Sequence, residues 1–149
     1  MSISVGQIEE EMPNVVINEV MWSGTSLSRD DQWIELRNTT NTDIDISKWS
    51  IESLRDIDKP RILIPAHHTI PANGYFLISN YSNESSNSLL NVESNMSNAS
   101  MYLLPLNNGN LILKDIDGNV IDQVLGVWPD GEQSPSYRSM QRTSNGTNG

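Results

Sequence analysis

Two glutamates, Glu19 and Glu35, lie within otherwise apolar runs of the sequence, where a carboxylate is unexpected. A pair of carboxylates can perform general acid–base chemistry, or it can bind a cation through its oxygens. A buried carboxylate must, however, be paired or hydrogen-bonded, so the same residues can instead help to specify the fold. We favour this structural interpretation, in which the glutamates accept bonds from backbone donors or pair with an arginine, such as Arg142. The predicted polar network consists of Asn18, Glu19, Glu35, Asn38 and Arg142.

The metal candidates are acidic residues in predicted loops. Asp30 and Asp31, and also the Asp56–Asp58 stretch, could bind a calcium ion weakly through carboxylate oxygens. Such clusters are more often merely solvated, so we predict no cofactor and no metal; the alternative is weakly bound calcium, with Asp30 and Asp31 as its candidates. The adjacent His67 and His68 would point to opposite faces of a strand, which is wrong for a shared zinc ion.

The segment from Asp115 to Asn119 is superficially similar to a calcium-binding EF-hand loop. Leu113 and Val124 stand where such a loop needs acidic ligands, so this interpretation fails. The Asp-Gly pair of the segment lies between two β-prone runs, where it supplies the positive φ angles of a tight turn. We therefore predict a β-hairpin.

The four tryptophans divide into two groups. Trp33 and Trp49 lie in strand-like runs and are predicted to be core residues. Trp22 and Trp128 border predicted loops and are candidate binding residues, because exposed indoles can form a platform for a sugar or a peptide.

Covalent catalysis finds no support in the sequence. The chain has no cysteine, no Gly-x-Ser-x-Gly motif and no phosphate-binding glycine loop. We therefore predict no catalytic residue and no enzymatic activity.

The net charge of −10 repels phosphate backbones and anionic lipid, so nucleic acid is not an expected partner. No stretch is apolar over the roughly 18 residues that a membrane span needs.

Short apolar runs bounded by turn residues recur along the chain, whereas helical periodicity is hard to find. Polar and apolar residues alternate from Asp43 to Ile51, which predicts a half-buried strand with Asp43 and Asp45 in solvent. About eight or nine such strands predict an all-β fold, an immunoglobulin-like β-sandwich of short antiparallel strands. The other predicted strands are Val15–Trp22, Trp33–Leu36, Arg61–Ile64, Tyr75–Ile78, Met101–Leu104, Leu111–Leu113 and a run that begins at Val120.

The segment from Asn80 to Ser100 interrupts this pattern. More than half of it is Ser and Asn, residues that bond their own backbone rather than join a sheet. We predict a long surface loop. It is either a contact surface of the domain, as long loops often are, or a solvated insertion without a role.

The order of several motifs resembles the lamin tail domain as it occurs in bacterial proteins. In that family an Ile-Asn-Glu strand is followed by a Trp-Ile-Glu-Leu strand, by a strand ending in Trp, and finally by an Ser-x-x-Arg motif. The corresponding residues here are Val16–Trp22, Gln32–Asn38, Ile44–Ile51, Ile70–Leu77, Leu113–Asp122 and Ser139–Arg142. The Ser/Asn-rich loop departs from the family pattern. The resemblance implies an immunoglobulin-like sandwich that acts as an interaction module.

We expect a disordered segment at residues 1–12, one β-sandwich domain at 13–143 and a flexible tail at 144–149. The predicted function is that of a non-catalytic structural or protein-interaction module within a larger secreted or cell-surface protein. Its expected partner is a protein or a surface polymer, bound by loops or by strand addition, and weak dimerisation through edge strands is a further option. The alternatives are an accessory domain of a metal-assisted hydrolase, with Glu19 and Glu35 at its site, and a carbohydrate-binding module.

Overall fold

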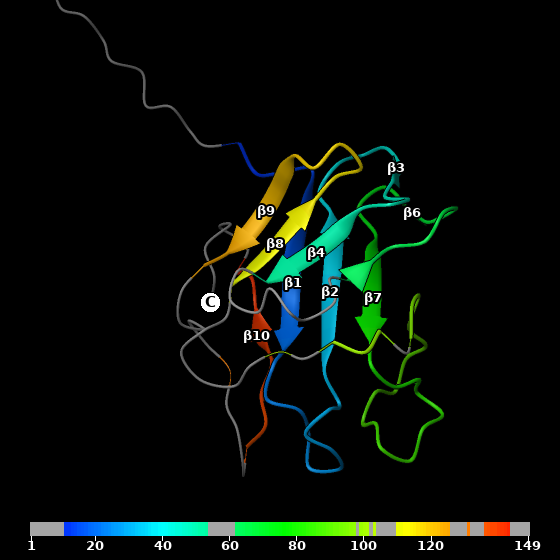
Figure 1. Ribbon diagram of the computed structural model, residues 1–149, viewed down its shortest axis with the longest axis vertical. Coiled ribbons are helices and arrows are strands. Elements are labelled where there is room, and N and C mark those ends of the chain that lie inside the picture. The colour runs from blue at the N-terminus through cyan, green and yellow to red at the C-terminus, as the bar shows by residue number, and fades with distance from the viewer. Residues whose placement is uncertain are drawn as a thin grey trace, which may run out of the picture.

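The computed structural model describes residues 11–53, 62–97, 99–101, 103, 110–125, 131 and 136–143. Within these residues it contains ten strands and no helix, so no described segment forms a helix able to cross a membrane (Figure 1). The strands are β1 (Val15–Met21), β2 (Trp33–Asn38), β3 (Ile44–Asp45), β4 (Ser50–Ser53), β5 (Ile62–Leu63), β6 (Thr69–Ile70), β7 (Tyr75–Ser79), β8 (Leu111–Lys114), β9 (Val120–Val124) and β10 (Met140–Gln141).

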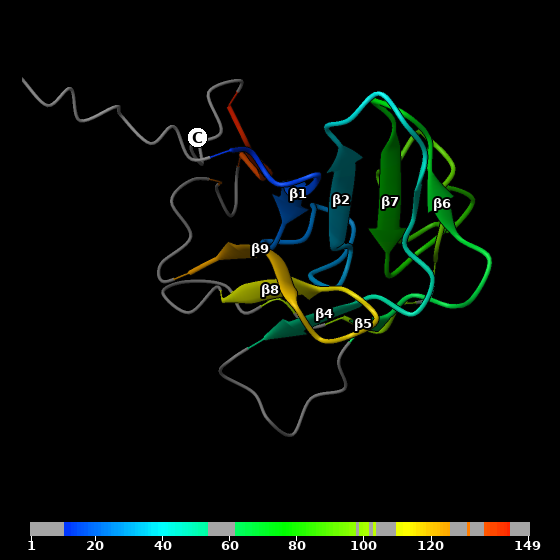
Figure 2. The ribbon, with the colours of Figure 1, turned by 90° about the horizontal axis from the view of Figure 1, so that it is seen from above.

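Two four-stranded antiparallel sheets form the body of the domain. One has the order β10-β1-β2-β7 and the other the order β5-β4-β8-β9, while β3 and β6 form a separate two-stranded ribbon. The two large sheets lie as two layers with their inner faces toward one another (Figure 2). The prediction of an all-β sandwich of short antiparallel strands is confirmed.

The alternation of side chains along each strand builds the core between the layers. In β2, Ile34 and Leu36 are fully buried, whereas Trp33, Glu35 and Arg37 are half-buried on the opposite face. The prediction that Trp33 is a core residue is therefore wrong, whereas Trp49 belongs to the core as predicted. A buried aliphatic side chain of this size contributes about 1.5–3 kcal/mol relative to an exposed one. The central contributors from both sheets are Val15, Ile17, Val20, Ile34, Leu36, Trp49, Ile51, Ile62, Phe76, Ile78, Leu111, Leu113 and Val124.

The stretch from Asp43 to Ile51 was predicted as one strand, but the structure divides it into β3 and β4. Asp43 and Asp45 are exposed and Ile46 is buried, as the alternation predicted. The chain then turns, because the Trp49 N–H donates to the Ile46 carbonyl at 3.1 Å and Lys48 adopts a positive φ of 66°. This turn moves the chain from the β3–β6 ribbon to the second large sheet.

The predicted hairpin between β8 and β9 is confirmed. The Asp115 N–H donates to the Asn119 carbonyl at 3.0 Å, and the Asp115 carboxylate accepts the backbone N–H groups of Asp117 and Asn119. Gly118 has a φ of 84°, which a residue with a side chain rarely adopts. The acidic residues of this segment therefore close a turn.

The predicted surface loop between Asn80 and Ser100 folds back onto the sandwich instead of extending into solvent. Met96 pairs with Ile78 in a parallel bridge along the edge of β7. Met101 and Leu103, which belong to a run predicted as a strand, are buried but lie outside the strands. Residues 1–10 of the segment 1–12 that was predicted to be disordered, and the predicted flexible tail at 144–149, lie outside the described residues.

Candidate functional site

A β-bulge in β1 organises the polar residues that the sequence singled out. The pairing of β1 with β2 runs in register as far as Ile17 opposite Leu36, and resumes with Glu19 opposite Glu35. Asn18 is the extra residue. A bulge leaves backbone groups without ladder partners and turns adjacent side chains toward the same face. Both consequences are visible here.

On the edge of β1 that faces β9, an ion pair completes the bulge. Arg142 Nη2 lies 2.6 Å from Asp122 Oδ2, and both side chains are about nine-tenths buried. The Ile17 N–H donates to the same carboxylate at 2.7 Å, while Arg142 donates through Nε to the Ile17 carbonyl and through its backbone N–H to the Asn18 carbonyl. Burial raises the pKa of Asp122, and the Ile17 N–H and Arg142 act in the opposite direction. This is a structural site that ties the C-terminal strand to both sheets.

Arg142, predicted as an alternative to backbone donors as the partner of the two glutamates, forms its ion pair with Asp122 instead. The sequence analysis missed Asp122. The alternation along β9 could have identified it, because Asp122 lies on the same inward side of the strand as the buried Val124. A carboxylate in a core position requires a cation or several hydrogen-bond donors.

The opposite side of the bulge carries Glu19 and Glu35, directly across from one another on β1 and β2. The observed donors are neutral. Asn18 Nδ2 donates to Glu35 Oε1 at 2.8 Å, and Trp33 Nε1 and Gln141 Nε2 donate to the two oxygens of Glu19 at 3.1 and 3.4 Å. Asn18, Glu19 and Glu35, which the sequence analysis grouped, lie together on this side of the bulge.

Burial of the Glu35 carboxyl raises its pKa above the ordinary value. The hydrogen bond from Asn18 lowers the pKa, and the nearby negative charge of Glu19 raises it further. The net effect is a raised pKa, because one neutral amide does not outweigh desolvation together with a like charge.

Asn38 belongs to a different part of the fold from the two glutamates. It is fully buried, and its Nδ2 atom donates to the carbonyls of Thr42, Ile70 and Pro71 at 2.7–3.0 Å. Its Oδ1 atom accepts the Thr40 N–H at 2.9 Å. The predicted role as a local cap and turn former describes this geometry, since Asn38 joins the end of β2 to the β3–β6 ribbon.

The calcium candidates Asp30 and Asp31 do not point to a common site. Asp30 is exposed, whereas Asp31 is 1% exposed and both of its oxygens accept protein donors. These donors are Thr25 Oγ1, Ser88 Oγ and the Leu89 N–H, at 2.7–2.8 Å. Within the described part of the chain, no three acidic, His or Cys side chains form a group that could hold a metal. The Asp56–Asp58 stretch lies outside that part.

The prediction that Trp22 forms a surface platform is wrong. Its side chain is 4% exposed and belongs to the core cluster. Gly131 lies so close to the indole that an added methyl group would come within 2.5 Å of Nε1. No face of the ring is open for a ligand to stack on. Trp128, the second candidate, lies outside the described residues.

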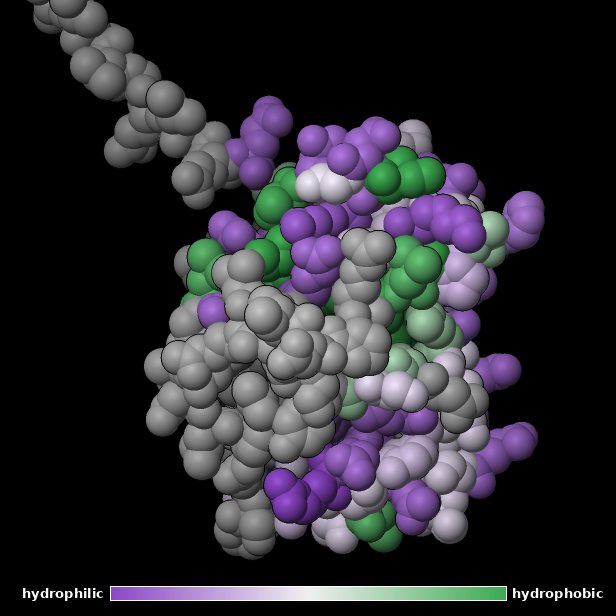
Figure 3. All heavy atoms as spheres, in the orientation of Figure 1, coloured by the Kyte–Doolittle hydropathy of each residue, from purple (hydrophilic) through white to green (hydrophobic). Residues whose placement is uncertain are grey.

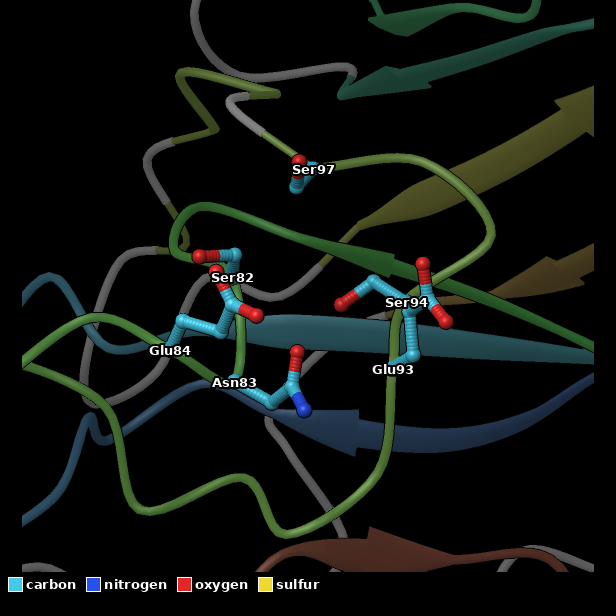
Figure 4. Close-up of a pocket in the computed structure, with 6 residues that line it drawn as sticks. All are labelled: Ser82, Asn83, Glu84, Glu93, Ser94 and Ser97. Carbon is cyan, nitrogen blue, oxygen red and sulfur yellow. The ribbon is translucent and has the colours of Figure 1, made fainter.

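The Ser/Asn-rich loop encloses a polar hollow of about 230 Å³. Two limbs of the loop face one another across it, one carrying Ser82 to Glu84 and the other Glu93 and Ser94 (Figure 4). The described lining offers hydroxyl, amide and carboxylate groups and no cation. It consists of Ser82, Asn83, Glu84, Glu93, Ser94 and Ser97.

Comparison with known families decides the relationship of the chain. The family model of the lamin tail domain matches residues 9–126, which include every strand from β1 to β9. The chain belongs to the lamin tail domain family. The resemblance of the motifs and the immunoglobulin-like architecture are thereby confirmed. Lamin tail domains are a non-catalytic family of modules. The Ser139–Arg142 motif lies beyond the matched segment. No curated protein matches the chain.

Proposed function

We propose that this lamin tail domain is a non-catalytic binding module of a larger secreted or cell-surface protein, and that the loop from Asn80 to Ser100 contacts a protein or a surface polymer. The observation that supports this most strongly is the way in which the polar loop is held. A loop that is rich in Ser and Asn yet held in one conformation by buried groups is preorganised for recognition.

Asp31 holds the first half of the loop. Its buried carboxylate accepts Ser88 Oγ and the Leu89 N–H, although the sequence separation is more than 50 residues. Asn80 closes the base of the loop, because its Oδ1 accepts the Met101 N–H at 2.7 Å and its Nδ2 donates to the Met101 carbonyl at 2.8 Å.

The edge of β7 holds the second half. Backbone bonds of 2.9 and 3.1 Å join Met96 to Ser79 and to Leu77, and Asn95 Oδ1 accepts the Leu77 N–H at 2.8 Å. The loop therefore occupies the edge where an added strand would otherwise pair. Strand addition at β7 is disfavoured by this arrangement, and contact through the exposed loop side chains is favoured.

The test is crosslinking of the full-length tagged protein on intact cells with a reagent that does not cross membranes. The loop variant carries Asn83→Ala, Glu84→Ala and Glu93→Ala, all at exposed positions. The control carries Asn41→Ala, Ile116→Ala and Asp117→Ala, which are exposed away from the loop. We expect the loop variant to lose at least about tenfold of its crosslinked partner, a loss of about 1.4 kcal/mol of binding free energy. Equal capture by all three proteins would contradict the loop as contact surface, and no labelling on intact cells would contradict the surface location.

A thermal melt with and without calcium separates this proposal from a calcium-assisted hydrolase. A bound ion stabilises the folded state by mass action. We expect the same melting temperature in millimolar calcium and in EDTA, because the oxygens of Asp31 are already engaged by protein donors. A clear rise in calcium that Asp30→Asn or Asp31→Asn abolishes would favour the hydrolase.

A further inference from the structure

The outer face of the β10-β1-β2-β7 sheet, the face turned away from the second sheet, has a row of residues that crosses all four strands. Gln141 lies opposite Glu19, Glu19 opposite Glu35, and Glu35 opposite Leu77. The two carboxylates are thus nearest neighbours in the centre of the sheet. Like charges in directly opposed positions destabilise a sheet.

No cation compensates these two charges within the described residues. The donors to Glu19 and Glu35 are an indole and two side-chain amides, all of them neutral. Arg37 follows Glu35 by two residues on the same face of β2, but its guanidinium lies over the Tyr75 ring, 5.8 Å from the centroid. The Nε atom of Arg37 is buried and has no hydrogen-bond partner. The nearest arginine on this face is therefore directed to an aromatic ring.

Trp33 places an aromatic side chain beside the uncompensated charges. It precedes Glu35 by two residues on β2, and its Nε1–H bond to Glu19 fixes the orientation of the indole. The Trp33 side chain is half-buried, so part of the ring remains accessible. Two carboxylates next to an indole favour an arginine or lysine side chain, which combines a cation with an apolar stem.

We propose that the outer face of the β10-β1-β2-β7 sheet binds a basic segment of a partner protein, with one arginine or lysine side chain seated at Glu19 and Glu35 against Trp33. This inference rests on the proposed binding role and names a second surface for it. The net charge of −10 would steer a basic partner toward the domain, and the row of Glu19 and Glu35 would then fix the position of the cation.

The test is an NMR titration of the ¹⁵N-labelled chain with a hexa-arginine peptide at low ionic strength. We expect the largest shifts at the Trp33 indole N–H and at the backbone amides of Glu19, Glu35 and Leu77. The variant Glu19→Gln/Glu35→Gln keeps oxygen acceptors for Asn18 and Trp33 and should bind about tenfold more weakly. The matched control Glu11→Gln/Asp117→Asn removes the same charge at exposed positions outside the sheet and the loop, and should bind as the wild type does.

Three outcomes would overturn the inference. Equal weakening in both variants would show attraction by net charge alone. Shifts confined to the loop would place the cation at Glu84 and Glu93 instead. No binding of hexa-arginine would exclude the basic partner, but it would leave the proposed loop contact intact, because the crosslinking experiment tests that contact separately. If the outer-face variant failed to fold, the shift map of the wild-type chain would still decide the location.

Discussion

The two sides of the β1 bulge carry charges in opposite arrangements. Toward β9, Arg142 and Asp122 form a buried ion pair in which the carboxylate also accepts the Ile17 N–H. On the outer face, Glu19 and Glu35 carry like charges, are half-buried, and accept bonds only from neutral donors among the described residues. A single irregularity in one strand positions both.

The difference separates stability from binding. Where opposite charges are buried and each is satisfied by the backbone, removal of one leaves the other uncompensated, so the pair maintains the fold. Where like charges face one another on an outer surface, the fold gains nothing from their negative charge, and a partner is needed to compensate it.

The space-filling view shows the face on the side of the second sheet, where apolar and polar side chains are mixed across the visible surface (Figure 3).

The largest effect is expected when the ion pair is broken. Arg142→Leu leaves Asp122 buried without its cation and removes the donor to the Ile17 carbonyl, so we expect a loss of about 3–5 kcal/mol in the free energy of unfolding. Urea denaturation at neutral pH measures this loss. The double variant Asp122→Asn/Arg142→Leu should lose less than the sum of the two single variants, because the uncompensated charge is gone. Strict additivity would contradict a coupled pair.

A smaller effect is expected from two asparagines, the fully buried Asn38 at the end of β2 and the half-buried Asn18 at the bulge. Asn38→Ala removes an amide that serves three carbonyls in a fully buried position, and should cost about 2–3 kcal/mol. Asn18→Ala removes one bond to a half-buried carboxylate and should cost less than about 1 kcal/mol. The two variants are compared by urea denaturation under identical conditions, and equal losses would show that burial does not distinguish them.

Glu35→Gln should stabilise the folded protein, whereas the substitutions above should destabilise it. The substitution keeps the acceptor for Asn18 and removes the repulsion by Glu19, so the variant should be more stable than the wild type at pH 7 by about 0.2–1 kcal/mol. A melt of both proteins by circular dichroism measures the difference. Destabilisation at pH 7 would mean that the negative charge of Glu35 supports the fold.

The smallest effect is the pH dependence of the stability difference between Glu35→Gln and the wild type. The folded-state pKa of Glu35 lies above the ordinary value of 4.5, so the folded protein binds the proton more readily than the unfolded chain does. The stability that this proton confers is present below pH 4.5 and is lost as the pH rises through the folded-state pKa. The advantage of Glu35→Gln should therefore shrink as the pH falls toward 4.5. An advantage that grows in acid would contradict the raised pKa.

The sequence predicted those parts of the fold that depend on local patterns. Alternation from Asp43 to Ile46 identified exposed and buried residues around β3, and the Asp-Gly pair identified the β8–β9 hairpin, because both depend on residues adjacent in the chain. Trp33, by contrast, was predicted in the core but lies half-buried on the outer face of β2. The bulge at Asn18 has no local pattern. It is set by pairing with strands more than ten residues away, so the separate roles of its two sides could not be derived.

The sequence analysis named most of the polar residues of the site but did not predict which of them contact one another. Glu19, Glu35, Asn18 and Arg142 were correctly chosen as polar residues within apolar surroundings. The ion pair of Arg142 depends on which strand of the second sheet packs against β1, and only the tertiary structure shows this to be β9. Trp22 was misjudged for a related reason, since a residue next to a loop in the sequence can still point into the core.

The unfolding free energy of the double variant Glu19→Gln/Glu35→Gln at pH 7 tests the central distinction most directly. If the outer-face carboxylates are not needed for folding, the double variant will be at least as stable as the wild type, because each glutamine retains one oxygen acceptor, for Asn18 at position 35 and for Trp33 at position 19. A loss of more than about 1 kcal/mol, beyond what an exposed ion pair typically contributes, would show that the two charges are part of the structural framework and would contradict the account.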